Sequence, residues 1–97
     1  MFQVSAFANS QNGYVENLNV TSSKLGENFT HVKLSGTWSG NPCEGTWWTL
    51  DSDTEEGKSF LSVILAAQMA AKEITIWGGS LECHGSMTRV LQVGITQ

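Results

Sequence analysis

Charged side chains are scarce in this chain of 97 residues, where they make up 14% of the sequence, against about 25% in ordinary soluble domains. Five of them are Lys or Arg, and these are scattered, so the basic stripe that binds nucleic acid is missing. Long apolar runs are missing as well, because the apolar part of the expected helix, residues 60–71, is shorter than the roughly 20 residues of a membrane span. We therefore expect no nucleic-acid partner and no membrane span.

Groups that carry chemistry are equally few. The histidines are His31, on an expected strand, and His84, which follows Cys83, and neither has the neighbours of a nucleophile or a general base. The two cysteines have no spacing that fits a zinc ligand set. Acids gather at residues 51–56, but they suit the start of a helix better than a calcium site. We expect no enzyme activity, no catalytic residue, no metal site and no cofactor.

The residues that are present indicate a folded, β-rich chain of an extracellular type. The apolar fraction is 40%, with plentiful Gly, Ser, Thr and Asn, and residues 1–97 are expected to form a single domain. Cys43 and Cys83 form either one disulfide or two buried reduced thiols. Residues 6–8 have the small-x-small pattern found before a leader cleavage site. We expect a secreted or periplasmic protein.

Alternation of apolar and polar residues predicts five strands, at residues 14–20, 29–38, 45–50, 73–77 and 90–95. The first is open to extension by residues 2–8, and residues 83–86 are predicted to be a loop. In the first strand, Tyr14, Leu18 and Val20 share one face, and in the second strand Val32, Leu34, Gly36 and Trp38 do. In the last three strands, the residues expected to point inward are Trp48, Leu50, Ile74, Ile76, Leu91, Val93 and Ile95. Alternation places Trp47 and Trp77 outward.

A helix is predicted over residues 55–71, with Asp53 or Thr54 as its N-cap and Glu56 in the capping-box position after Asp53. Two apolar stripes run along it. The first is expected to face the core and contains Phe60, Val63, Ile64, Ala67 and Ala71. The second contains Leu61, Leu65 and Met69, and it needs either more of the same core or a contact with another subunit.

The element order is three strands, one helix and two strands. This is the order of a five-stranded Greek-key OB barrel, a mainly β fold with one helix. An open α+β roll is the alternative.

The second half of the chain resembles a known group of proteins. The residues that carry the resemblance are Cys43, 48–51, Gly57, Lys58, 61–68, 74–76, Cys83 and 90–95. They are similar to small exported OB-fold proteins related to the B subunits of bacterial toxins, such as the subtilase cytotoxin B subunit. The resemblance implies export, a Cys43–Cys83 disulfide and a ring-shaped homo-oligomer that binds sugars, with a pentamer as one candidate size.

The chain departs from that group at residues 78–82, where a shorter Gly-rich turn is usual, and at its helix end, which has no glycine. No glycan-contacting residue of the toxin subunits can be matched to this chain. Flat indole faces stack on sugar rings, so the outward Trp47 and Trp77 are the expected ligand-binding residues, unless a subunit contact or a loop covers them. The two functions under consideration are a glycan-binding module that associates through Leu61, Leu65 and Met69, and a structural or protein-interaction domain without a small ligand.

Overall fold

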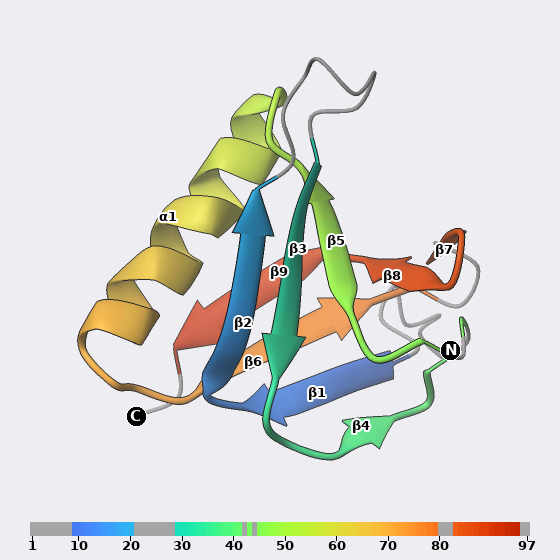
Figure 1. The fold of residues 1–97 in the computed structure, drawn as a ribbon, viewed down its shortest axis with the longest axis horizontal. Helices are drawn as coiled ribbons and strands as arrows, with labels where there is room; N and C mark the ends of the chain where they lie inside the picture. The colour runs from blue at the N-terminus through green and yellow to red at the C-terminus, as the bar shows by residue number, and fades with distance from the viewer. Residues whose placement is uncertain (1–8, 21–28, 42, 44, 80–82, 96–97) are drawn as a thin grey trace, which may run out of the picture.

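A computed structural model describes residues 9–20, 29–41, 43, 45–79 and 83–95, and in these the chain is mainly β with one helix (Figure 1). The helix α1 spans Glu55–Met69. The strands are β1 Asn9–Gly13, β2 Val15–Val20, β3 Phe29–Leu34, β4 Trp38–Ser39, β5 Trp48–Asp51, β6 Ile74–Gly78, β7 Cys83–His84, β8 Met87–Arg89 and β9 Gln92–Ile95. The predicted fold class, mainly β with a helix, is confirmed.

The strands form two sheets, a four-stranded sheet in the order β4-β1-β6-β9 and a five-stranded sheet in the order β2-β3-β5-β8-β7. Only Tyr14 separates β1 from β2, and only Val90 and Leu91 separate β8 from β9, yet each pair is divided between the two sheets. At both places the chain bends from one sheet into the other. In the part of the chain that the structure describes, the sheets do not close into one barrel, so the predicted five-stranded OB barrel is not confirmed.

Neighbouring strands are antiparallel except for β5 and β8, which run parallel with Trp48 opposite Thr88. The predicted loop at residues 83–86 is wrong, because Cys83–His84 forms β7 and pairs with β8. Gly85 joins the two strands at a φ of 65°, a left-handed conformation that glycine adopts without steric cost and that permits a tight hairpin.

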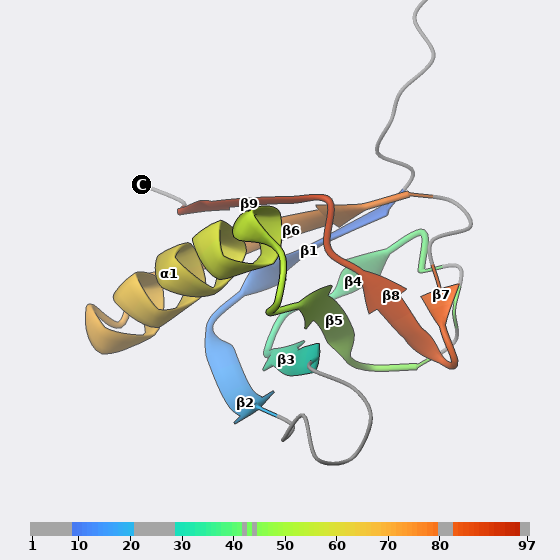
Figure 2. The ribbon, with the colours of Figure 1, turned by 90° about the horizontal axis from the view of Figure 1, so that it is seen from above.

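The core lies between the two sheets and is covered on one side by α1 (Figure 2). Trp48, Ile74 and Ile76 are completely buried, as their alternation predicted. The buried cluster consists of Val32, Leu34, Trp48, Leu50, Ile64, Ala67, Ile74, Ile76 and Val90.

Two strand predictions are wrong at their ends. The strand predicted over residues 29–38 stops at Leu34, because the chain turns at Gly36 and β4 then joins the other sheet beside β1. A Cβ on Gly36 would lie 1.5 Å from the carbonyl oxygen of Asn12, so this turn lies directly against β1. Ile95, predicted to be buried, is 40% exposed, although its partner Ile74 at the last position of the β6–β9 ladder is buried; β9 is an edge strand of its sheet.

The helix starts at Thr54, one of the two predicted N-caps, whose hydroxyl oxygen accepts a hydrogen bond from the Gly57 backbone N–H at 2.9 Å. With Thr54 as the cap, the third helical residue is Gly57, so the capping box predicted for Asp53 and Glu56 is wrong. The helix ends at Met69, two residues before the predicted end. No helix among the described residues is both long and apolar enough to cross a membrane.

Candidate functional site

The candidate site is a cavity of about 340 Å³, which lies beside the turn from β3 to β4 and the loop from β4 to β5. We call this cavity the Trp38 pocket. The side chains that give it its chemistry are Gln11, Glu16, Lys33, Trp38, Asn41 and Thr46. They come from β1, β2, β3, β4 and the β4–β5 loop, so the pocket exists only when both sheets are assembled.

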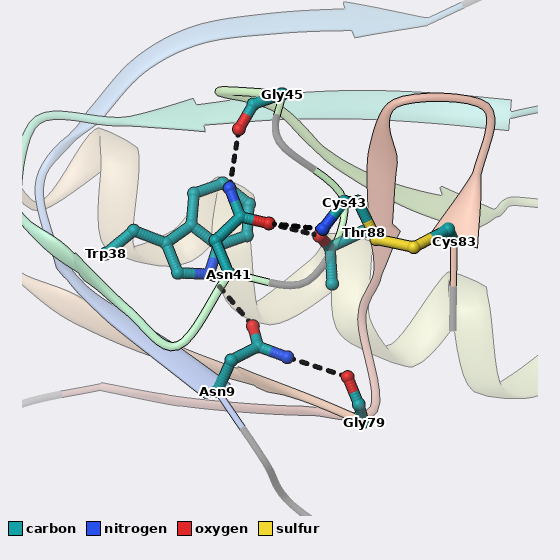
Figure 3. Close-up of a disulfide and its surroundings, with 8 residues drawn as sticks. All are labelled: Asn9, Trp38, Asn41, Cys43, Gly45, Gly79, Cys83 and Thr88. Carbon is teal, nitrogen blue, oxygen red and sulfur yellow. Dashed lines mark hydrogen bonds between the residues drawn. A yellow bond between two sulfur atoms is a disulfide. The ribbon is translucent and has the colours of Figure 1, made fainter. Parts of the chain in front are cut away.

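The Trp38 ring is held in a defined orientation. It stacks on the buried ring of Trp48, with centroids 4.2 Å apart and an angle of 13° between the planes. Its Nε1–H donates a hydrogen bond of 2.8 Å to Oδ1 of Asn9 (Figure 3). Trp38 as a whole is half-exposed, so the part of the ring that Trp48 leaves uncovered is available to the cavity.

Gln11 lines the Trp38 pocket and connects it to the core. Its Oε1 accepts a hydrogen bond from the Trp48 Nε1–H at 2.9 Å, and its Nε2 donates to the Gly36 carbonyl oxygen at 2.6 Å. The side chain is 5% exposed, and a buried amide is tolerated because both its ends are hydrogen-bonded.

Asn41 organises the loop on the other side of the cavity. Its Nδ2 donates to the carbonyl oxygen of Gly45, and its Oδ1 accepts from the Cys43 backbone N–H and from the Thr88 hydroxyl (Figure 3). Cys43 and Cys83 form a disulfide that ties the same loop to β7. The loop wall of the Trp38 pocket is thus held by both a covalent bond and a side-chain network.

The two charges in the Trp38 pocket are opposite in sign. Glu16 is exposed and Lys33 is half-exposed, and they come from the paired strands β2 and β3. The pocket therefore offers one carboxylate, one ammonium group and an indole ring, with no net charge, while the Gln11 and Asn41 amides in its wall bond to other groups of the protein.

A second cavity, of about 230 Å³, lies where β5 meets the start of α1. Asp51, Glu56 and Arg89 line it together with Phe60. Its acids are those that sequence analysis assigned to the helix start, and Arg89 lies over the ring of Phe29 at 5.7 Å. Among the described residues that line this cavity, none is a tryptophan.

The predicted ligand-binding residues do not meet in one site. Trp47 directly follows Thr46 of the Trp38 pocket and leads into β5 of the five-stranded sheet. Trp77 lies in β6 of the four-stranded sheet, and its ring packs against Gly94 on β9. Both tryptophans are half-exposed, which agrees with their predicted outward orientation. Their role in ligand binding stays a prediction.

The predicted interface residues differ in burial. Leu61 packs against the core, whereas Leu65 is 39% and Met69 88% exposed. Among the described residues, no three His, Cys, Asp or Glu side chains are grouped to hold a metal ion.

Sequence reasoning missed Trp38, Asn9 and Gln11 as site residues. It placed Trp38 on the same strand face as Val32 and Leu34, because alternation cannot show that the chain turns at Gly36. The segment containing Asn9 and Gln11 is rich in turn-forming residues and gave no strand signal. The tryptophans could have pointed to them, because the N–H of an indole that packs in a core needs a hydrogen-bond acceptor, and the amides of Asn9 and Gln11 are such acceptors.

Comparisons of the chain with models of known protein families, with curated proteins and with solved structures find no match. The argument for function therefore depends on the geometry of the site.

Proposed function

We propose that this chain is an exported, non-enzymatic binding module that takes a sugar ring of a glycan in the Trp38 pocket. The observation that carries the proposal is the Trp38 indole, locked by Trp48 and Asn9 at the wall of a polar, open cavity. The side chains around it include the carboxylate of Glu16, the ammonium group of Lys33 and the hydroxyl of Thr46, which can form hydrogen bonds with sugar hydroxyl groups.

Sugar recognition needs two kinds of contact at once. The C–H face of a pyranose packs on an aromatic ring, while its hydroxyl groups need planar polar partners at the ring edge. Trp38 supplies the first contact, and Glu16, Lys33 and Thr46 supply the second from the surrounding wall. Because the pocket has no net charge, we expect a neutral sugar ring rather than a phosphate or a nucleotide.

The scaffold proposed for this module is an OB-type barrel that is partly open. In this interpretation β1 and β2 are one bent strand, and β8 and β9 are another. The sheet pairings support it, because β1 pairs with β6, β2 with β3, β3 with β5, and β5 runs parallel to β8. OB folds are frequent carriers of oligosaccharide sites. The Cys43–Cys83 disulfide supports an oxidising compartment, secreted or periplasmic, and is consistent with the toxin B subunit resemblance.

The test is a screen of immobilised neutral and charged glycans, followed by calorimetric titration of the best binder. We expect Glu16→Gln to weaken that binding about tenfold, because a charge-assisted hydrogen bond becomes a neutral one. Glu16 is exposed, so the change should not affect folding. Glu55→Gln on α1 is the matched control and should leave the affinity unchanged.

Two results would contradict the proposal. One is the absence of binding across the whole screen. The other is loss of binding in Trp77→Ala with full binding in Glu16→Gln, which would move the site to the four-stranded sheet.

A protein-interaction domain without a small ligand is the second candidate function. The exposed Leu65 and Met69 favour it, since adjacent apolar side chains on a helix surface often mark a contact with another protein. This function and glycan binding use different surfaces, so the two can coexist in one molecule.

A further inference from the structure

Two buried amides hold the two stacked indoles of the core. Asn9 and Gln11 are two residues apart on β1, so both side chains point to the same, inward face of the sheet. They are 4% and 5% exposed. Oδ1 of Asn9 accepts a hydrogen bond of 2.8 Å from the indole N–H of Trp38, and Oε1 of Gln11 accepts one of 2.9 Å from the indole N–H of Trp48.

An amide is an expensive choice at an inward strand position. Burial of an amide costs free energy that its hydrogen bonds only roughly recover, whereas an apolar side chain would gain free energy from burial. Among the described residues no buried side-chain N or O atom lacks a partner. A fully satisfied network of this kind adds little to stability compared with apolar packing, but it fixes the orientation of the groups that it joins.

Asn9 bonds at both ends of its amide group. While Oδ1 accepts from Trp38, Nδ2 donates to the Gly79 carbonyl oxygen at 2.8 Å (Figure 3). Gly79 directly follows β6, so the Trp38 ring is connected through Asn9 to the strand next to β1. Asn9 does not itself line the cavity, and it can act on a ligand only through Trp38.

We infer that Asn9 is a positioning residue of the Trp38 pocket. Its amide holds the Trp38 indole flat on Trp48, and this presents the remaining ring surface to the sugar in the orientation that binding needs. The inference rests on the proposed glycan-binding function. Without Asn9 the indole N–H has no acceptor at this position, and the ring leaves the stacked orientation to reach water or another acceptor.

The first measurement needs no ligand. Two indoles that stack closely couple their electronic transitions and give a bisignate circular dichroism band. Asn9→Leu has nearly the same size but neither hydrogen bond, and we expect it to reduce this band strongly while the backbone signal of the fold is kept. If Asn9→Leu does not fold, the smaller Asn9→Ser serves instead, because it cannot reach both partners. Asn12→Leu, an exposed position on the same strand, is the control and should keep the band.

The second measurement is the affinity for the glycan found in the screen. We expect the Asn9 variant to bind about tenfold more weakly than the wild type, because the aromatic surface is no longer pre-organised, and Asn12→Leu to bind normally. An unchanged circular dichroism band in a folded Asn9 variant overturns the inference, and so does a lost band with unchanged affinity. If the wild type binds no glycan, both the proposed function and the role of Asn9 in glycan binding are wrong. The circular dichroism band, which is measured without a ligand, still shows whether Asn9 holds the two indole rings together.

Discussion

Gly57 shows how one residue sets the place where the helix meets the sheet. A Cβ at this position would lie 1.7 Å from the carbonyl oxygen of Asp51, the last residue of β5. Gly57 also donates its N–H to the Thr54 hydroxyl. The end of β5 and the first turn of α1 are therefore in backbone contact, and only glycine leaves room for it.

At this scale we predict that Gly57→Ala destabilises the protein. Alanine is favoured over glycine inside a helix by about 1 kcal/mol, but the clash with Asp51 forces the helix away from β5. We expect a net loss of about 1–3 kcal/mol in the free energy of unfolding, measured by urea denaturation. Ser59→Ala, at an exposed position of the same helix, is the control. Equal or greater stability of Gly57→Ala would show that the first turn can move without cost.

Other single residues were within reach of sequence reasoning. Alternation predicted the buried Trp48 and the more exposed Trp47 correctly, although Trp47 precedes β5 and Thr49, the next residue of the strand, is buried as well. It could not recognise Trp38 as part of a cavity wall, since that depends on Gln11 and Glu16 from distant segments.

At the scale of elements, the end of α1 departs from prediction because of one backbone conformation. Ala71 has a φ of 54°, and the bonds from Lys72 N–H to the Ala67 carbonyl and from Ala71 N–H to the Gln68 carbonyl form a Schellman motif. The left-handed position of this motif is usually glycine. Helix propensity favours a helix that continues through Ala70 and Ala71, whereas in the structure the chain turns at these residues toward β6.

We predict that Ala71→Gly stabilises the protein by about 1 kcal/mol, because glycine adopts the left-handed conformation without the steric cost that alanine has. Thermal or urea unfolding measures the change. Ala70→Gly is the matched control, since Ala70 has a right-handed helical conformation with φ of −88°, and glycine there should not stabilise. A loss of stability in Ala71→Gly would contradict the motif.

At the scale of the whole molecule, α1 has apolar side chains that the rest of the domain does not cover. Leu65 and Met69 are 39% and 88% exposed, while Leu61 on the same stripe packs against the core. The stripe that sequence analysis assigned as a unit is thus divided, and only its outer part is available to another subunit.

We predict that the wild-type chain has a solution mass above the 10.5 kDa of one chain, and that Leu65→Glu lowers it to the single-chain value, because a charge cannot be buried in an apolar contact without a partner. Light scattering coupled to size-exclusion chromatography measures both masses. Ser59→Glu adds the same charge at an exposed position on another side of the same helix and should keep the wild-type mass. A wild-type mass of one chain would remove the case for self-association.

The sequence by itself determined the properties that depend on neighbours along the chain. A helix start at Asp53 or Thr54, the inward faces of Trp48, Ile74 and Ile76, and the mainly β class all follow from local spacing, because caps and alternating burial depend on residues a few positions apart. Only the tertiary structure decided that β1 and β2 enter different sheets, that Gln11 and Trp38 line one cavity, and that Asn9 bonds to the Trp38 indole. Those arrangements depend on contacts between segments that are distant in sequence, and the strength of such contacts cannot be seen in local periodicity.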